Sequence, residues 1–449
     1  MFKKILIANR GEIAVRIIRA CREMGIETVA VYSQSDIDAL HAEMADEAIC
    51  IGPAKARDSY LNMQNIISAT VLSGAEAIHP GFGFLSENSE FAEMCRACNI
   101  TFIGPDPESI EKMGNKSRAR EIMMEANVPV VPGSSGSVPS IEEGLGLADK
   151  IGYPVMIKAS AGGGGRGIRI VKDKEEFAKA FETAKSEAKN AFGDDTMYVE
   201  KFVENPRHIE FQILADNYGN TVYLGERDCS IQRRNQKVLE EAPSPIVSEE
   251  LRREMGDVAV CAAKAVGYKN AGTIEFLVDK YGKYYFMEMN TRIQVEHPIT
   301  EMVTGIDLIK EQIKIAAGEK LSFEQKDIKI NGHAIECRIN AENPDQGFRP
   351  SPGKIERMHI PGGLGVRLDS AAYQGYVIPP TYDSMIGKLI VHGITREEAI
   401  NRMKRALGEF VIEGIDTNID FQFRILSSEV FASGNFDTGF IAKELKVKF

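Results

Sequence analysis

Two acidic residues stand at matched positions around a predicted turn. In the segment TIEFLVDKYGKYYFMEMNTR, two apolar runs flank the pair Tyr281–Gly282, and Glu275 and Glu288 are symmetric about that pair. A hairpin centred there would set the two carboxylates opposite each other. Like charges directly opposite destabilise a strand pair, so their coexistence indicates a bound cation between them.

The residues around the second glutamate predict which cation this is. Side chains alternate along a strand, so Asn290 would share a face with Glu288, whereas Met287 and Met289 would point toward the core. Carboxylate and amide oxygens, without cysteine or histidine, suit Mg²⁺ or Mn²⁺ carrying phosphates. The alternative is a solvated face with two unrelated glutamates, because a shift of the turn by one residue would spoil the pairing.

A charged cluster follows this strand in the segment NTRIQVEHPITE. Stability alone explains such a cluster poorly beside a predicted metal site. Arg292 could hold an anion, and Glu296 could act as a general base. His297 precedes a proline, and we interpret it as a residue that satisfies a turn.

A glycine-rich stretch, KASAGGGGRG, occupies residues 158–167. A Walker A loop places its lysine after the glycines, whereas Lys158 precedes them at the end of an apolar strand and Arg166 follows them. The stretch predicts a flap whose backbone N–H groups close over phosphates. A plain flexible loop remains the alternative, because a glycine run by itself is a weak signal.

Basic character is local rather than global. The net charge of −11 argues against a nucleic-acid partner but permits ATP binding. Arg233, Arg234 and Lys237 in CSIQRRNQK could face a phosphate or another small anion, although such a run is usually solvated surface. Seven scattered cysteines predict reduced thiols in a cytoplasm, and Cys95 and Cys98 fit one face of a helix. No segment is typical of a membrane span.

The elements that must position these residues begin with a β-α-β pattern. Residues 4–8 and 28–32 are typical of buried strands, and residues 13–24 carry helical periodicity. Similar alternation to about residue 105 predicts a parallel sheet with right-handed crossovers. The first turn is NRGE, so the dinucleotide fingerprint is missing and no nicotinamide site is predicted.

The pattern changes after residue 112. A helix is predicted over 117–127, and residues 131–203 form a small α+β insert that contains the glycine stretch. Strands then dominate, and residues 331–449 mix strands with a final helical stretch. The predicted domains are therefore 1–112, 113–330 and 331–449.

At this point the motifs identify a family. The combination of IANRGEIAVRIIRA, HPGFGFLSEN, KASAGGGGRG, ERDCSIQRRNQK, EMNTRIQVEHPITE and PSPGKIERMHIPGG closely resembles biotin carboxylase, over essentially the whole chain and in the family's order. The resemblance implies a mixed α/β and α+β structure. It would consist of a Rossmann-like domain, an ATP-grasp domain whose mobile lid is 131–203, and a mixed C-terminal domain.

The resemblance also implies a set of site residues. ATP contacts fall on Lys116, Lys158, Gly164, Gly165 and His208, and the adenine segment on Glu200, Lys201, Phe202 and Val203. Metal ligands fall on Glu275, Glu288 and Asn290, and bicarbonate contacts on Lys237, Arg292, Gln294 and Val295. Glu296 matches the general base, and Arg338 matches the arginine that steadies the biotin enolate.

The sequence departs from relatives at four positions. Ala161 replaces a glycine of the lid, Phe202 and Phe82 replace tyrosines, and Asn235 replaces a histidine. The Asn235 amide can still hydrogen-bond a phosphate or a ribose hydroxyl, although it carries no charge. We therefore retain Asn235 among the ATP contacts.

The resemblance implies partners as well as chemistry. The chain contains no EAMKM-type motif, so biotin is expected on a separate carrier protein, with a carboxyltransferase completing the complex. A homodimer is expected, because Arg19, Glu23 and Arg367 match interface positions. Acetyl-CoA is the expected final acceptor, with pyruvate or another acyl-CoA as alternatives. Another ATP-grasp ligase or a non-catalytic nucleotide-binding module would be the rival functions.

Overall fold

The computed structural model describes residues 1–159, 167–192 and 194–445. The chain divides into two compact units, Met1–Val128 with Arg207–Phe276 and Glu288–Phe449, and Pro129–Pro206 with Leu277–Met287. The predicted domain boundaries after residues 112 and 330 both fall inside the first unit and stay predictions.

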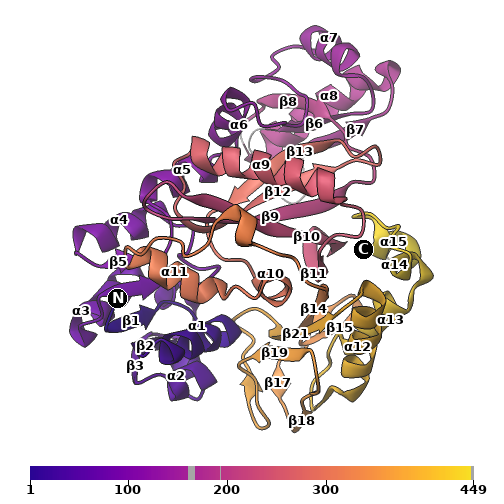
Figure 1. The fold of residues 1–449 in the computed structure, drawn as a ribbon. Helices are drawn as coiled ribbons and strands as arrows, with labels where there is room; N and C mark the ends of the chain where they lie inside the picture. The colour runs from indigo at the N-terminus through magenta and orange to yellow at the C-terminus, as the bar shows by residue number, and fades with distance from the viewer. Residues whose placement is uncertain (160–166, 193, 446–449) are drawn as a thin grey trace. The chain divides into compact units, whose positions relative to one another are not determined.

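The first unit begins with a five-stranded parallel sheet, shown in indigo and violet in Figure 1. Its order is β3-β2-β1-β4-β5, and all its strands pair in parallel, as the β-α-β pattern predicts. The strands are β1 (Lys4–Ile7), β2 (Glu27–Ser33), β3 (Glu47–Gly52), β4 (Ala77–His79) and β5 (Thr101–Phe102). The helices of this segment are α1 (Gly11–Glu23), α2 (Leu40–Met44), α3 (Met63–Ser73), α4 (Ser89–Ala97), α5 (Pro107–Gly114) and α6 (Lys116–Glu125).

The same unit carries most of an eight-stranded sheet of order β13-β12-β9-β10-β11-β14-β21-β19. Its strands are β9 (Arg207–Ala215), β10 (Thr221–Arg233), β11 (Gln236–Ala242), β12 (Asn270–Val278), β13 (Tyr284–Asn290), β14 (His333–Asn340), β19 (Val366–Ser370) and β21 (Met385–Gly393). The remaining short strands are β15 (Glu342–Asn343), β16 (Arg349–Pro350), β17 (Gly353–Lys354), β18 (Arg357–His359), β20 (Val377–Ile378) and β22 (Val411–Glu413). The helices are α9 (Glu249–Ala265), α10 (His297–Thr304), α11 (Leu308–Ala316), α12 (Arg396–Glu409), α13 (Ile419–Ser427), α14 (Glu429–Ala432) and α15 (Phe440–Glu444).

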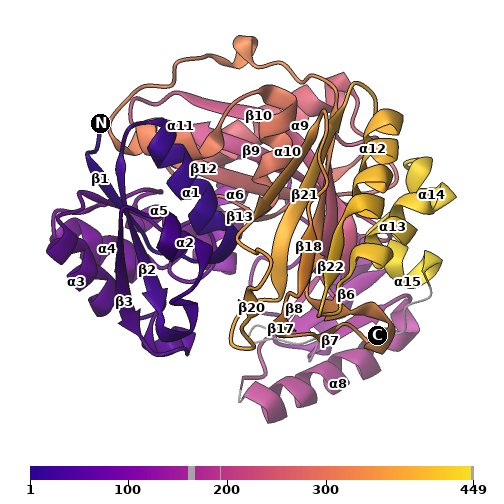
Figure 2. The same ribbon diagram turned by 90° about the horizontal axis from the view of Figure 1, so that it is seen from below.

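Strands β14 and β21 have one face in an apolar core and one face that carries charged side chains beside the apolar Ala334 and Ile390. Ile335, Cys337 and Leu389 point into the core shared with α12 and α13, and Figure 2 shows α12 running along β21. The intervening residues Arg338 and Lys388 are cross-strand partners on the opposite face, which α10 covers. This period-2 alternation places charged side chains under the segment that follows β13.

The second unit is a three-stranded antiparallel sheet of order β7-β6-β8 with two helices. Its elements are α7 (Ile141–Ile151), β6 (Val155–Ala159), β7 (Ile168–Val171), α8 (Lys174–Phe192) and β8 (Met197–Lys201). Ile157 and Val199 pack against Phe177 and Phe181 of α8 to form its core. The predicted strand VMIKAS ends at Ala159, and the rest of the glycine stretch up to Arg166 lies outside the described residues.

Three local predictions need correction. The Asp279 N–H donates to the Lys283 carbonyl at 2.8 Å, so the hairpin turn is centred on Tyr281, and direct opposition of the two glutamates does not follow from it. Met289 is buried as predicted, but the Met287 side chain is 37% exposed. Only the first of the two predicted helix cysteines lies within the helix, because Cys95 is buried in α4 and Cys98 is the exposed residue at its C-terminal cap.

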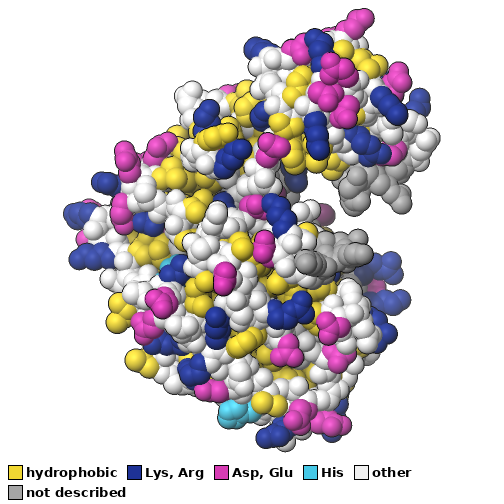
Figure 3. All heavy atoms as spheres, turned by 90° about the vertical axis from the view of Figure 1, so that its right-hand side faces the viewer, with side chains coloured by type: hydrophobic (Ala, Val, Ile, Leu, Met, Phe, Trp, Pro, Cys, Tyr) yellow, Lys and Arg dark blue, Asp and Glu magenta, His cyan; other side chains and the backbone are white. Residues whose placement is uncertain are grey.

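The surface agrees with the composition. Figure 3 shows basic and acidic side chains interspersed over the face in view, rather than a single basic stripe. Among the described residues, no helix is both long enough and apolar enough to cross a membrane.

A helix glycine tests the packing of α9 on β10. A Cβ on Gly256 would lie 2.5 Å from Cε1 and Cζ of the Tyr223 ring, whereas Gly408 in α12 has open space at the same atom. We expect Gly256→Ala to lower the unfolding free energy by about 1–3 kcal/mol because the ring must move. The control Gly408→Ala should raise it by up to about 1 kcal/mol, since alanine favours helix. Denaturant unfolding compares the two, and equal effects would contradict the described packing.

Candidate active site

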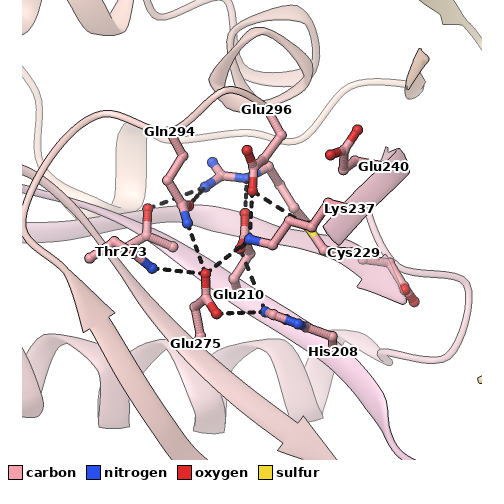
Figure 4. A network of polar contacts seen from close by, with 12 residues as sticks. His208, Glu210, Cys229, Lys237, Glu240, Thr273, Glu275, Gln294 and Glu296 are labelled. Carbon is pink, nitrogen blue, oxygen red and sulfur yellow. Dashed lines mark hydrogen bonds and ion pairs between the residues drawn. The ribbon is translucent and has the colours of Figure 1, made fainter. Parts of the chain in front are cut away.

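A largely buried lysine forms the centre of the charged cluster drawn in Figure 4. Nζ of Lys237, on β11, lies 2.5 Å from Glu210 Oε2, 2.6 Å from Glu296 Oε1 and 2.9 Å from Glu275 Oε1. One ammonium therefore contacts three carboxylates that come from β9, β12 and the segment before α10. The side chain keeps 13% of its surface exposed, so a ligand can reach it.

The sheet brings these groups together through alternation and register. His208 and Glu210 are two residues apart on β9 and share a face. Arg227 is the cross-strand partner of Glu210 on β10, and its wholly buried guanidinium donates to that carboxylate at 2.6 Å. It also donates to Gln294 Oε1 at 2.7 Å. Sequence reasoning missed Glu210 and Arg227. The alternation of polar and apolar residues in HIEFQ could have indicated that Glu210 shares a strand face with His208.

The lysine sets the protonation states of its partners. Burial alone would raise the pKa of Glu275 and Glu296, but Lys237 and other cations hold both pKa values well below the usual range. At Glu210 burial dominates instead, and its pKa is raised. Burial would lower the pKa of Lys237, yet the three carboxylates raise it well above its usual value. The ammonium is therefore charged at neutral pH, as are Glu275 and Glu296.

Glu296 is held from a second side by Arg338 of β14. The guanidinium lies 3.0 Å from Glu296 Oε2 and donates through Nε to Glu240 Oε1 at 2.7 Å. Glu240, on β11, is fully buried and was not predicted from the sequence. The predicted base thus lies between two cations, Lys237 and Arg338.

The residues predicted to hold a metal fit an oxygen-ligated cation. Asn290 Nδ2 donates to Glu275 Oε1 at 2.8 Å, so these two side chains are in contact. Glu288 lies 3.8 Å from Lys116, and burial together with the nearby Glu275 raises its pKa. Two carboxylates that repel each other beside an amide oxygen are a donor set suited to Mg²⁺ or Mn²⁺. The metal assignment itself stays a prediction.

The segment 291–295 contains three of the residues that are predicted to contact an anion. Arg292 donates to Glu87 Oε2 at 2.8 Å and to Asn290 Oδ1 at 3.0 Å. Gln294 Nε2 donates to Glu275 Oε1 at 2.8 Å, and the Val295 carbonyl accepts a bond from Lys388. Sequence reasoning did not single out Glu87, which is distant in the chain.

Of the remaining predicted ATP contacts in the first unit, His208 has close polar partners, whereas Lys116 and Asn235 are exposed. Gln232 Nε2 lies 2.7 Å from His208 Nδ1 and can donate to it when the imidazole carries its proton on Nε2. That Nε2 atom lies 2.8 Å from Glu275 Oε2. Lys116 and Asn235 are exposed, the latter in the turn between β10 and β11 with φ 64°.

The predicted residues of the second unit are described within that unit. Lys158 Nζ lies 2.5 Å from Glu200 Oε2, and Lys201 donates to the Gly152 and Tyr153 carbonyls at 3.0 Å. Phe202 N–H donates to the Pro154 carbonyl at 3.1 Å, and Val203 is half-buried beside it in the chain. Gly164 and Gly165 lie outside the described residues.

Two secondary interpretations can now be compared with the structure. His297 is fully buried, and its Nδ1 lies 2.7 Å from the Gln294 carbonyl, so it stabilises the turn before α10. Of the basic run, Arg233 lies over the Phe348 ring at 4.1 Å. Only Lys237 of that run joins the charged cluster.

Removal of the central ammonium should destabilise the fold. Lys237→Met leaves buried Glu210, Glu275 and Glu296 short of a cation, and we expect a loss of about 3–5 kcal/mol in unfolding free energy. Chemical unfolding at pH 7.5 measures it. The control Lys112→Met, at an exposed position of α5, should change stability by less than about 0.5 kcal/mol. Equal stability of the two variants would show that Lys237 does not hold the cluster together.

Glu240 should make stability depend on pH. Burial, together with Glu296, raises the pKa of Glu240 to about 7 despite its contact with Arg338. A raised carboxyl pKa means that the folded state binds a proton that the unfolded state releases, so this contribution is present below about pH 4.5 and is lost as pH rises through about 7. Glu240→Gln lacks the titrating carboxyl and therefore does not lose this stability. The melting temperature of the variant minus that of wild type should thus rise between pH 5.5 and pH 8. A pH-independent difference would contradict the raised pKa.

Comparisons with known proteins agree with this architecture. Residues 1–110 match the N-terminal domain family of biotin carboxylase, residues 336–443 match its C-terminal domain family, and residues 115–324 match the ATP-binding domain of the carbamoyl-phosphate synthase L chain. Biotin carboxylase 1 of Bacillus subtilis is 63% identical over 98% of both chains. A pyruvate carboxylase subunit of Methanothermobacter thermautotrophicus is 57% identical over 98% of this chain and 90% of its own.

The fold of a solved structure is closely similar as well. The biotin carboxylase domain of Hydrogenobacter thermophilus 2-oxoglutarate carboxylase, a dimer in complex with MgADP, ADP and bicarbonate, is 53% identical. It covers 100% of this chain and 98% of its own, with a TM-score of 0.91. The arrangement of a parallel-sheet domain before an ATP-binding domain is therefore the one expected from the motifs. The chain belongs to the biotin carboxylase family of ATP-dependent ligases.

Proposed function

We propose that this chain carboxylates biotin on a separate carrier protein, using ATP, Mg²⁺ and bicarbonate, by way of carboxyphosphate. The observation that supports this most directly is the position of Glu296, bound on one side by Lys237 and on the other by Arg338. A carboxylate between two cations is ready to accept a proton once an anionic substrate shares one of those cations. Bicarbonate is such an anion, and biotin becomes one when its ureido nitrogen loses a proton.

The proposed ATP contacts are those that the motifs predict. In this proposal Lys116, Lys158 and His208 contact the phosphates together with Gly164 and Gly165, while residues 200–203 and Asn235 contact the nucleoside. Glu275, Glu288 and Asn290 would hold Mg²⁺, or Mn²⁺. When bound, that ion supplies positive charge for the β and γ phosphates during transfer.

Bicarbonate would bind to Lys237, Arg292, Gln294 and the backbone of Val295. Lys237 helps to keep the pKa of Glu296 well below its usual range. An anion that shares Lys237 weakens that hold, so the pKa of Glu296 rises and the carboxylate becomes a stronger base. Glu296 would then take the bicarbonate proton as bicarbonate attacks the γ-phosphorus.

Biotin would meet the other cation of the pair. Carboxyphosphate gives CO₂ and phosphate, and that phosphate takes the ureido N1 proton. Arg338, anchored through Nε to Glu240, would stabilise the resulting enolate oxygen. A well-placed donor of this kind contributes on the order of 3 kcal/mol to the transition state.

The downstream acceptor and the assembly are part of the proposal. We favour acetyl-CoA, in fatty acid synthesis, with pyruvate or another acyl-CoA as alternatives because relatives include a pyruvate carboxylase subunit. Carrier protein and carboxyltransferase subunits are the expected partners. For a homodimer, Arg19 is exposed as an interface residue should be, whereas Arg367 is engaged by Asp369 and Glu301 of its own chain.

The test is ADP release from ATP with Mg²⁺ and bicarbonate, with and without free biotin. Bicarbonate-dependent release that biotin stimulates would support the proposal. Release that ignores biotin but responds to ammonia or another amine would indicate a different ATP-grasp ligase. No release under any condition would favour a non-catalytic nucleotide-binding module.

Two variants test the assigned roles. Arg338→Ala removes the enolate donor and Glu296→Ala removes the base, so each should lower biotin-dependent kcat by at least about tenfold with little change in ATP affinity. The control Arg405→Ala breaks an exposed pair with Glu409 and a hydrogen bond to the Gly362 carbonyl, and it should keep wild-type turnover. Full turnover in either active-site variant would refute its role.

A further inference from the structure

A second buried lysine lies beneath the predicted bicarbonate segment. Lys388, on β21, is 0% exposed, and no motif of the sequence marked it. A buried ammonium carries a large desolvation cost unless charged and polar partners compensate for it. The partners of the Lys388 ammonium therefore indicate what this residue does in the protein.

Lys388 joins three segments that are far apart in the chain. Its Nζ donates to the Val295 carbonyl at 2.9 Å and lies 3.1 Å from Glu12 Oε1, on α1. Glu12 is itself buried and lies within ion-pair distance of the ammonium, while the hydrogen bond described for the ammonium goes to Val295 of the active-site segment. One ammonium thus links α1, β21 and residues 291–296.

The carbonyl that Lys388 contacts belongs to the peptide that leads into Glu296. A peptide unit is planar, so a bond that fixes the Val295 oxygen also fixes the nitrogen of Glu296 and the direction in which its Cα leaves the plane. Arg338 is the cross-strand partner of Lys388 and contacts the Glu296 carboxylate at 3.0 Å. Two neighbouring cations of one sheet face therefore hold the same residue, one through its backbone and one through its side chain.

Three other side chains lie near Lys388 without binding its ammonium closely. Asp369 is its cross-strand partner on β19, but that carboxylate is engaged by Arg367 at 2.6 Å. Glu336 lies diagonally across on β14, and neither of its buried oxygens has a hydrogen-bond partner among the described residues. The Phe82 ring centroid is 5.9 Å from Nζ. Glu12 and the Val295 carbonyl are thus the close partners of Nζ.

We propose that Lys388 is a positioning residue for the bicarbonate reaction. It holds the Val295–Glu296 peptide in one orientation, which keeps the bicarbonate contacts of this segment and the Glu296 carboxylate in register with Lys237 and Arg338. The inference rests on the proposed function, and it adds a residue that touches no substrate. Its effect should fall on bicarbonate rather than on ATP.

Three variants separate positioning from plain stability: Lys388→Met, Glu12→Gln and the double variant. Lys388→Met removes the bond to Val295 and leaves Glu12 unpaired, so it should lower both the melting temperature and kcat/KM for bicarbonate, the latter at least about tenfold. KM for ATP should change less than about twofold. Glu12→Gln keeps the Val295 bond, so its bicarbonate kinetics should stay within about threefold of wild type.

The double variant decides between the two explanations. It removes the unpaired carboxylate along with the lysine, so its melting temperature should recover toward that of Glu12→Gln, while kcat/KM for bicarbonate stays low. Recovery of kcat/KM together with the melting temperature would show that Lys388 only offsets a buried charge. Wild-type-like bicarbonate kinetics in Lys388→Met would overturn the proposal outright.

A second readout does not depend on turnover. Hydrogen exchange of the amides of residues 293–297 should be faster in the double variant than in Glu12→Gln, since the peptide loses its anchor, while exchange in α12 stays unchanged. Unchanged exchange in 293–297 would overturn the positioning role. If wild type shows no bicarbonate-dependent ADP release, the proposed function fails, and this comparison still decides whether Lys388 holds the segment.

Discussion

The active site depends on the compensation of buried charge around Lys237. Burial of a carboxylate or an ammonium is costly, and a partner is needed for each charge that stays ionised. Here one ammonium contacts Glu210, Glu275 and Glu296, while Arg227 supports the first of these from the neighbouring strand. Such a network is weak evidence for stability, but it fixes where each oxygen lies, which is what catalysis on small anions requires.

The sheet makes this compensation possible by separating its two faces. Odd-numbered residues of β14, Ile335, Cys337 and Ile339, complete an apolar core with α12 and α13. On the other face, Arg338 and Lys388 are paired directly across two strands beneath the segment after β13. A strand with a period of two can therefore join a stable core to a charged site without placing charge in the core.

Substrate binding would redistribute the contacts of this cluster rather than create them. Lys237 and Arg338 already carry their charge and already contact Glu296, so an incoming anion competes with that carboxylate for two fixed cations. Glu240 retains Arg338 while this exchange takes place, because it binds the guanidinium through Nε. Preorganisation of this kind reduces the reorganisation needed at the moment of reaction.

The sequence by itself determined the elements, the family and the residues that carry motifs. Period-2 and period-3.6 patterns predicted the parallel sheet, the helices and the α+β insert, because burial of one face imposes them locally. The motif RIQVEH after EMN indicated Arg292 and Glu296. Tertiary structure alone decided which distant residues complete the site: Glu87, Glu210, Arg227, Glu240 and Lys388 are ordinary charged residues in sequence. Their role arises from strand register and from the scarcity of partners for buried charge, which are properties of the assembled sheet. The same reason explains the misplaced hairpin centre, because a one-residue difference in a turn is set by backbone hydrogen bonds that composition does not reveal.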